Sequence, residues 1–525
     1  MVTSSYTQGL EPFRRTFQVP ELASIIYRFS SKGDYVNLLY LSREFYNWLL
    51  PIIWEDVDLI HALLLVPGAR DASKNSGDPI KAEYCTTLGF ASPVDLTRFN
   101  IHAPLIKTVR TEELYDVAFP STWPSLGSPS NPNPLFPNLQ CLVVNSMNGL
   151  GDECLAWWCH LFTPGLLEFR MLSLGTLSES EFVNQSEECP GLGTKACLDL
   201  IDQLSRNCPR LERLRLYPAD YVKDGQGGYC SLYGNLTAFT NLRSFSLVVS
   251  EVHSDVFEAL GQLPHLENLV LRSSGAMLPT KDPITVPDKS FPCLRALSLY
   301  GLDEDPIVRI CKITPLFRHL VSAEIITDYY SHEDYPGDYE RSKVAVESMG
   351  ENSPHLRNIT IHPRGNFGSF VVSAYTINAF RCMPLTSLNL GMIDFDTGPN
   401  SSSSGHDLAR GYSPTAQWTT FLATVPQLEQ FYIEQQELEA KYLWQFATHL
   451  PNLRLLVIGG TTFDGTEEPS NEIQASQPIL IRTRLQLSSQ MSQSFLDRTL
   501  PNTSVPVVAR FVISSTKVFL TLTSS

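Results

Sequence analysis

The chain has 525 residues, of which 43% are hydrophobic and 18% charged, and this composition excludes a mainly disordered protein. Its net charge of -16 argues against nucleic acid as the main partner, because phosphate binding needs a basic face. The sequence shows no secretory leader and no apolar run of membrane-spanning length, so we expect a cytoplasmic or nuclear protein. Its 11 scattered cysteines exclude a small disulfide scaffold and favour free thiols.

Two short apolar helices are predicted in residues 16–59. Pro20 and Glu21 suit a first helical turn, because proline has no donor to lose there and glutamate complements the helix dipole. Leu22 and Ile26 begin an apolar stripe at helical spacing. The second helix is apolar on more than one face, through Leu38, Leu41 and Phe45. Such a pair needs a partner, which is either the rest of the chain or another protein.

This segment resembles an F-box. The residues that match the family pattern are Val19-Pro20-Glu21-Leu22, Ile26, Asp34, Leu41-Ser42-Arg43, Phe45 in the usual tryptophan position, and Trp54. The departures are Ser30, Tyr35 and the replacement of tryptophan by Phe45. In that family the F-box binds the Skp-type adaptor of a cullin–RING ubiquitin ligase. The resemblance therefore implies an adaptor-binding site made of Pro20, Glu21, Leu22, Ile26, Leu38, Leu41, Phe45 and Trp54.

Residues 60–134 are predicted to hold a linker and a degenerate first repeat. An apolar helix is expected over residues 57–66, where Pro67 and Gly68 end it. Residues 96–110 indicate a first helix followed by a strand. The polar stretches between and after these elements are expected to be loops, because they are rich in Pro, Ser and Asn.

One phrase recurs from residue 135 to residue 460, and it decides the fold class. The phrase is Pro-x-Leu-x-x-Leu-x-Leu, and full copies start at Pro209, Pro264, Pro292 and Pro451. Variants of the phrase have their first leucine at Leu139, Leu166, Leu242, Leu320, Leu356, Leu385 and Leu428. The shorter intervals between copies match the length of one strand-and-helix unit, and the longer intervals hold insertions.

Each copy of the phrase ends in alternating apolar and polar residues, which predicts a short strand. Its apolar residues, among them Leu214, Leu269 and Leu297, are expected to be buried in the core. Many copies follow an amphipathic stretch that predicts a helix: residues 196–207, 255–263, 341–349, 415–425 and 440–450. One such unit cannot bury its own apolar face, so the units must stack. The phrase resembles the strand-and-helix class of leucine-rich repeats. The predicted fold is therefore α/β, an N-terminal helical F-box followed by a leucine-rich-repeat solenoid with a curved parallel sheet.

The last segment, residues 461–525, lacks the phrase. It is predicted to be a C-terminal cap or a partly disordered tail, and residues 479–487 and 505–522 within it read as strands.

Catalytic chemistry is not expected. The sequence has no phosphate-binding loop, zinc-protease motif or nucleophile elbow, so we expect no enzyme activity and no cofactor. Cys154, Cys159 and His160 form the one Cys/His cluster worth testing for a metal. Their apolar neighbours favour helix core over a metal site.

The polar strand positions are the predicted substrate-binding surface, because in this class of solenoid they face away from the core. Stacking of the repeats should place Arg213 and Arg215 near Ser244, Ser246 and Asn268 of the neighbouring strands. Arginine and tyrosine, which are enriched at interface hot spots, occur among them. The candidates are Arg213, Arg215, Tyr217, Asn268, Arg272, Tyr300 and Tyr432. The alternative is that these are ordinary solvated sheet residues.

An F-box directly before leucine-rich repeats is typical of substrate receptors. The resemblance therefore implies a non-catalytic substrate-recognition subunit of an SCF-type E3 ubiquitin ligase. Its implied partners are a Skp-type adaptor, the cullin–RING ligase bound through that adaptor, and a protein substrate. The alternative is a repeat scaffold outside ubiquitin transfer, in which residues 16–59 are a helical cap on the array.

Overall fold

The structure is a computed structural model, and it divides the chain into two compact units. These are Met1–Leu174 with Asp202–Leu211, and Gly175–Ile201 with Glu212–Ser525. The described residues are 34, 37, 39–40, 43–67, 69–71, 88–89, 95–111, 134–146, 158–173, 194–216, 235–249, 254–273, 284–302, 304–327, 339–363, 370–391, 393–395, 414–439, 443–462, 480–483, 507–514 and 517–524. The domain boundaries expected at residues 59, 134 and 460 stay predictions.

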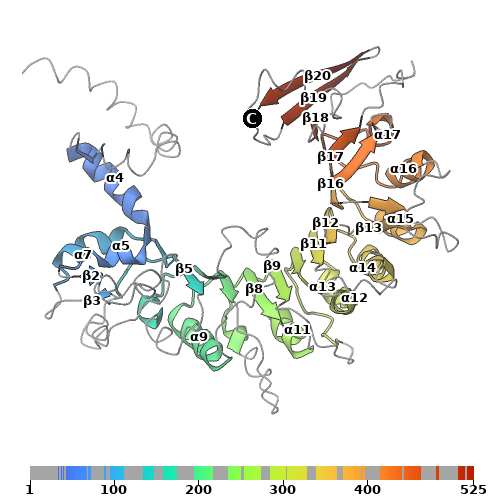
Figure 1. Ribbon diagram of the computed structural model, residues 1–525. Helices are drawn as coiled ribbons and strands as arrows, with labels where there is room; N and C mark the ends of the chain where they lie inside the picture. Colours follow the sequence, from blue (N-terminus) through green and yellow to red (C-terminus); the bar gives the residue numbers. More distant parts are fainter. Residues whose placement is uncertain are drawn as a thin grey trace, which may run out of the picture. The chain divides into compact units, whose positions relative to one another are not determined.

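The first unit combines short helices with parallel strands that pair in the order β1-β4-β5-β6 (Figure 1). Its elements are α4 (Arg43–Glu55), β1 (Asp56–Asp58), α5 (Leu59–Leu63), β2 (Arg70–Asp71), β3 (Leu88–Gly89), α7 (Thr97–His102), the 3-10 helix η2 (Ala103–Leu105), β4 (Thr108–Arg110), β5 (Cys141–Ser146), the 3-10 helix η4 (Cys159–Leu161) and β6 (Glu168–Ser173). Helix α9 (Thr194–Asn207) contributes residues to both units. The predicted first helix and strand within residues 96–110 are confirmed as α7 and β4.

The helix expected over residues 57–66 is wrong at its start. Residues Asp56–Asp58 form strand β1, which pairs with β4, and only then does helix α5 begin. Two aspartates explain the difference. The carboxylate of Asp56 accepts two hydrogen bonds from Arg110, at 2.8 and 2.9 Å, and Asp58 caps α5 by accepting from the Ile60 amide at 2.8 Å. A residue that caps the start of a helix has an extended backbone, and Asp58 is such a residue. The strand therefore ends and the helix begins at Asp58, although the apolar residues continue through this point in the sequence.

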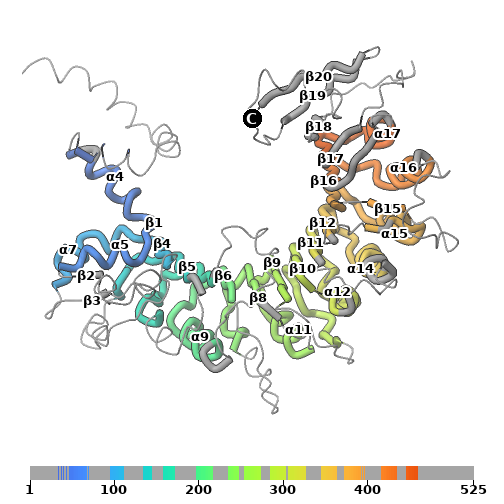
Figure 2. The backbone as a smooth tube through the Cα atoms, viewed as in Figure 1, coloured from blue at the N-terminus to red at the C-terminus, as the bar shows by residue number. Residues whose placement is uncertain are grey.

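The second unit repeats strand and helix along the chain (Figures 1 and 2). Its first elements are β7 (Arg213–Leu216), the 3-10 helix η6 (Asn235–Ala238), β8 (Ser244–Val249), α11 (Ser254–Gly261), β9 (Asn268–Ser273), β10 (Ala296–Tyr300), α12 (Glu304–Cys311), α13 (Thr314–Phe317) and β11 (Ser322–Thr327). They continue as α14 (Tyr339–Asn352), β12 (Asn358–Pro363), β13 (Phe370–Val372), α15 (Ala374–Arg381), β14 (Ser387–Asn389), β15 (Ile393–Phe395), α16 (Pro414–Leu422), β16 (Gln430–Glu439), α17 (Leu443–His449) and β17 (Leu455–Thr462). The five predicted helices correspond to α9, α11, α14, α16 and α17.

The strands of this unit pair in parallel in the order β7-β8-β9-β10-β11-β12-β14-β16-β17. One inward row, at most 2% exposed, runs through Leu214, Phe245, Leu269, Leu297, Ala323, Ile359, Leu388, Phe431 and Leu456. The predicted burial of Leu214, Leu269 and Leu297 is thereby confirmed. Burying each large apolar side chain contributes about 1.5–3 kcal/mol, so this row is a main source of stability. The fold is that of a leucine-rich-repeat solenoid.

Each repeat is tied to the next by a shared backbone acceptor. The carbonyl oxygen of Glu267, the residue just before β9, accepts from the amides of Arg295 at 2.8 Å and Ala296 at 2.9 Å. The same pattern recurs from Arg295 to Val321 and Ser322 in the next repeat. Because two consecutive amides share one acceptor, the starts of β8 to β12, β14, β16 and β17 are each fixed against the preceding repeat.

The repeat between β9 and β10 has no helix over its described residues 284–295. In this repeat the side chain of Phe291 fills the core, and it is 1% exposed. Its backbone has a φ of 58°. Its amide donates to the Gly261 carbonyl at 3.0 Å, and a Cβ on Gly261 would lie 2.5 Å from Ser290 Cβ. The close approach explains the glycine at the end of α11, and tight packing of a loop replaces a helical layer.

The last strands are β18 (Leu480–Thr483), β19 (Val507–Ser514) and β20 (Lys517–Ser524). Strand β18 continues the parallel pairing on β17, whereas β19 and β20 are antiparallel. The two stretches that read as strands in residues 461–525 thus contain strands. Among the helices in the described part of the chain, none has the length and apolar character needed to cross a bilayer.

Candidate protein-binding surface

The polar positions of neighbouring strands line up in register. Arg213 lies beside Ser244 and then Asn268, and Arg215 lies beside Ser246. This alignment was predicted from the repeat phrase and is confirmed. Arg213 and Asn268 are exposed, and Arg215 is half-buried. A row through residues contributed by successive strands can contact one partner over several repeats.

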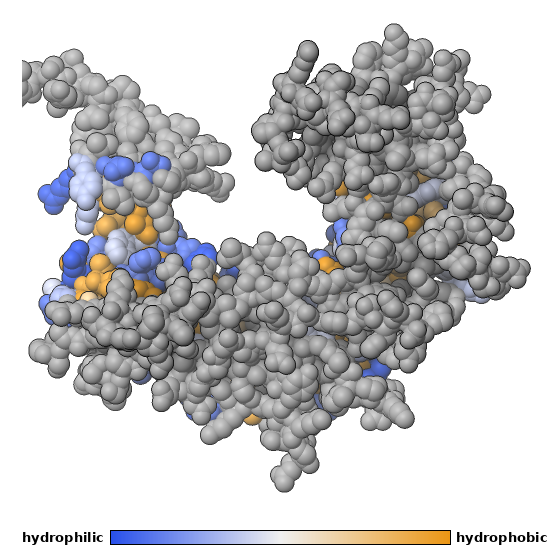
Figure 3. Space-filling view, in the orientation of Figure 1, coloured by the Kyte–Doolittle hydropathy of each residue, from blue (hydrophilic) through white to orange (hydrophobic). Residues whose placement is uncertain are grey.

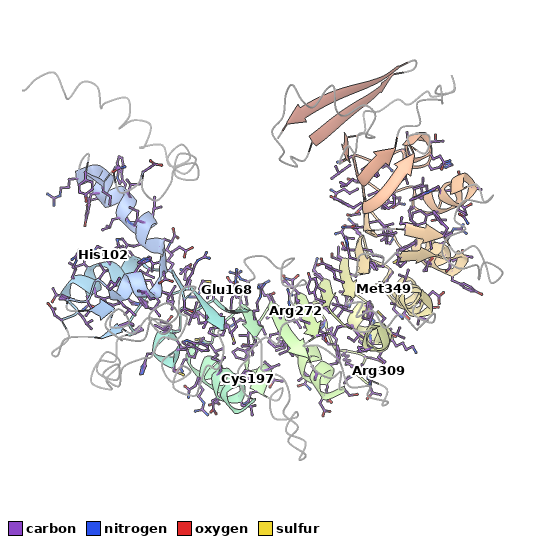
Figure 4. The ribbon with its side chains drawn as sticks, viewed as in Figure 1. His102, Glu168, Cys197, Arg272, Arg309 and Met349 are labelled. Atoms are coloured by element: carbon purple, nitrogen blue, oxygen red, sulfur yellow. The ribbon has the colours of Figure 1, made fainter. Side chains whose placement is uncertain are left out.

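Three strands join in a polar network on the same face. The Arg272 guanidinium from β9 lies 4.5 Å from the ring centre of Tyr300 on β10. The Tyr300 hydroxyl donates to Glu324 Oε2 on β11 at 2.5 Å, and Ser298 Oγ donates to the same oxygen at 3.3 Å. Figure 4 shows Arg272 in the strand layer, whereas the labelled Arg309 and Met349 belong to α12 and α14. A cation over an aromatic ring and a hydroxyl on a carboxylate each stabilise this arrangement.

The network is largely closed to solvent. Arg272 is 2% exposed and Tyr300 is 7% exposed. Burial, followed by the hydrogen bond to Glu324, raises the pKa of Tyr300 well above its ordinary value, so the phenol stays a neutral donor. The expectation that every polar strand position is solvent-exposed is therefore wrong for these two residues. The physical reason is mutual coverage, since each long side chain lies over its neighbour in register.

The remaining sequence candidates lie in different settings. The Tyr432 hydroxyl donates to Gln430 Oε1 at 3.2 Å on a half-buried side chain of β16. Trp54 is half-buried at the end of α4 and stacks on His102, with ring centres 4.5 Å apart. Phe45 lies within α4, and the structure describes only its backbone. Candidates outside the described residues are Pro20, Glu21, Leu22, Ile26, Leu38, Leu41 and Tyr217.

The expected Cys/His core cluster is only partly described. Cys154 lies outside the described residues, Cys159 is half-buried in η4 and His160 beside it is exposed. Across the described ranges, no group of three or more His, Cys, Asp or Glu side chains is placed to hold a metal ion.

A further polar row was missed at the sequence level. We define the leading row of the second unit as the residues that directly precede successive strands: Glu212, Arg243, Glu267, Arg295, Val321, Arg357, Thr386, Glu429 and Arg454. The shared backbone acceptors place these residues side by side. The signal was present in the phrase, because each member follows the first leucine of its copy and most members are charged.

A scan against protein-family models finds no match for the chain, and a search of curated proteins finds none either. Similar solved structures include an internalin from Listeria monocytogenes, 13% identical over 62% of this chain and 82% of that chain, with a TM-score of 0.26. The leucine-rich-repeat-containing protein LegL7 from Legionella pneumophila is 14% identical over 60% of this chain and 87% of that one, with a TM-score of 0.27. The Rad7 and Elc1 complex of yeast is 14% identical over 89% and 97%, with a TM-score of 0.32. Such distant likenesses carry no functional argument, and the fold assignment rests on the strand register and the repeated phrase.

Proposed function

We propose that this chain is the substrate-recognition subunit of an SCF-type E3 ubiquitin ligase, with an F-box that binds a Skp-type adaptor and repeats that bind the substrate. The observation that carries the proposal is the exposed apolar surface of the first unit. Tyr40 is 84%, Tyr46 40%, Leu64 48% and Ile101 61% exposed. Figure 3 shows hydrophobic residues on the surface of this unit. Large apolar side chains that stay in water are typical of a protein-binding site when they form one patch.

The sequence pattern and this surface support each other. Tyr40 and Tyr46 lie within the F-box-like segment, which carries Pro20, Leu22 and Ile26 at its start. Leu64 lies just after the segment, and Ile101 lies farther along the chain in α7. In the second unit the polar strand face is the proposed substrate surface. The apolar surface of the first unit would bind the adaptor, and the polar strand face of the second unit would bind the substrate. Two separate surfaces of this kind suit a receptor that acts by holding a substrate near an enzyme.

One observation favours the alternative, a repeat scaffold with a helical cap. Strand β1 directly follows α4 and pairs with β4, so the N-terminal helices are continuous with the sheet. Trp54, one of the adaptor candidates, stacks on His102 of the same unit. Both contacts are those of an element that closes a repeat array.

Adaptor pull-down with the full chain distinguishes the two functions. We expect the wild-type chain to retain a Skp-type adaptor and a Leu22→Asp, Ile26→Asp double variant to lose it, because charges in a dry contact are strongly unfavourable. Tyr375→Asp is the matched control, since Tyr375 is 62% exposed on α15 in the second unit. Adaptor retention by the folded double variant, or its absence from the wild type, would refute the ligase function and leave the scaffold.

A further inference from the structure

Opposite charges alternate at both ends of the leading row and neutralise each other. Arg243 Nη1 lies 2.5 Å from Glu267 Oε1, and Arg454 Nη1 lies 3.5 Å from Glu429 Oε2. Neighbouring members of the row are separated by one strand spacing of about 4.8 Å, a distance that long side chains bridge easily. Each of these two ion pairs is neutral, and Glu212 adds one acid at the start of the row, so neither end offers a partner excess positive charge.

The middle of the leading row breaks this alternation. From Arg295 to Thr386 the row reads Arg, Val, Arg, Thr, without an acid. Arg295 and Arg357 are both exposed, and neither guanidinium forms an ion pair with any residue in the described part of the chain. Val321 separates them, so their Cα atoms lie two strand spacings, or about 9.6 Å, apart. The row therefore presents two arginines, one on each side of Val321, that form no ion pair within the described residues.

The turns just before this stretch add one further cation, Arg318, and two histidines. Arg318, His319 and His355 are all exposed there. Arg318 Nη1 donates to the backbone carbonyl of Asp288 at 3.0 Å, which leaves its other donors to solvent. We call Arg295, Arg318, His319, His355 and Arg357 the basic edge. It lies on a chain whose net charge is -16, so it stands out against the average field of the molecule.

We propose that the basic edge docks an acidic segment of a partner protein. The guanidinium fork of arginine binds carboxylates through two parallel hydrogen bonds, and two such forks can hold successive Asp or Glu side chains. The next positions along the strands are the polar residues Ser322 and Asn358, which are paired in register and offer hydrogen-bonding groups to a peptide backbone. A nucleic acid fits less well, because its continuous phosphate charge would meet the strongly acidic remainder of the chain.

This inference deepens the proposed function, because it rests on the repeats as the substrate-binding part and names the chemistry of the segment they take. It does not depend on the N-terminal module. A failed adaptor pull-down would therefore leave it standing, and a failed peptide titration would leave the adaptor proposal standing.

The test is fluorescence anisotropy of the full chain with a labelled peptide of alternating glutamate and serine. A lysine–serine peptide and a single-stranded DNA oligonucleotide serve as comparison probes. We expect the glutamate peptide alone to bind, and to bind more weakly as salt rises from about 50 to 200 mM. An Arg295→Ser, Arg357→Ser double variant should weaken binding at least about tenfold, from the loss of two charge-assisted contacts. Arg454→Ser, from the same row but already paired with Glu429, should change binding less than about twofold.

A second double variant keeps the test decisive if the serine double variant does not fold. Arg295→Lys with Arg357→Lys retains the charge and removes the forks, and should still weaken binding several-fold. The proposal is overturned if the wild type does not bind the glutamate peptide. It is also overturned if Arg454→Ser weakens binding as much as the double change, or if the oligonucleotide binds in place of the peptide.

Discussion

Both units bury an apolar core, but they differ in how many large apolar side chains they leave exposed. Among the described large hydrophobic residues, those left exposed in the first unit are Tyr40, Tyr46, Leu64 and Ile101, whereas the second unit leaves Tyr375. In the second unit each repeat covers the apolar face of the next, so its surface is set by charged and small polar residues. The difference shows that the apolar residues that stabilise the repeats are distinct from the large apolar residues that stay exposed. The repeats bury their leucines against one another, whereas the first unit leaves some large apolar side chains in water.

The largest expected difference comes from truncating one leucine in each unit to alanine. Leu269→Ala removes a fully buried leucine from the inward row and should lower the free energy of unfolding by about 2–5 kcal/mol. Leu64→Ala removes a leucine that is 48% exposed and should cost less than about 1 kcal/mol. Urea denaturation measures both. Equal losses would show that the first unit buries Leu64 in a core of its own.

A pair of glycines sharpens the same comparison. A Cβ on Gly350 of α14 would lie 3.0 Å from the backbone of Ala379 on α15, so Gly350→Ala should destabilise by about 1–3 kcal/mol. Gly165 of the first unit has its nearest neighbour, the Leu139 carbonyl oxygen, at an ordinary 3.6 Å. Gly165→Ala should be close to neutral. Thermal melting of the two variants checks the pair, and a neutral Gly350→Ala would mean that the gain in helix propensity and a small shift of α15 offset the close contact.

The polar network on the strands provides a smaller effect. Tyr300→Phe removes the donor to Glu324 and leaves a half-buried carboxylate short of one partner, which should cost about 1–2 kcal/mol. Tyr432→Phe removes a hydroxyl that contacts the side chain of exposed Gln430 and should cost less than about 0.5 kcal/mol. Chemical denaturation distinguishes these values. If the two changes cost the same, the network around Arg272 adds nothing beyond a surface hydrogen bond.

The smallest effect concerns buried thiols at alkaline pH. Burial raises the pKa of Cys197 and Cys311 from 9.0 to about 12. The unfolded chain therefore loses these protons above about pH 9 while the folded chain keeps them. Stability is fully present below pH 9 and falls as the pH rises toward 12, by about 1 kcal/mol per thiol at pH 10.

The thiol prediction is measured as the difference in unfolding free energy between pH 8 and pH 10. A Cys197→Ala, Cys311→Ala variant should show a smaller loss than the wild type. Cys382→Ala, which removes an exposed thiol, should show the same loss as the wild type. If the loss in the buried-cysteine variant matched that of the wild type, the two thiols would have no part in it.

The repeat phrase predicted the inward leucines because their period is local to each copy. It also predicted which strand positions align, since parallel stacking places equivalent residues side by side. Burial of Arg272 and Tyr300 was not predictable from either copy alone, because each side chain is covered by a residue from another strand. The start of β1 was missed for a similar reason, since its hydrogen-bonding partner Arg110 lies 54 residues away. The predicted adaptor residues at the start of the F-box-like segment stay a prediction.

The carbonyl that accepts two amides at the start of each strand also determines where the chain can lengthen. One extra residue between the first leucine of a copy and its strand would shift both amides away from the acceptor, and every outward side chain would turn toward the core. A residue added after the end of a strand disturbs no such pair, and a longer loop costs little entropy. The uneven spacing of the copies is therefore compatible with an unbroken sheet. Such a chain can acquire loops of any length along one edge of its sheet while the opposite edge stays unchanged.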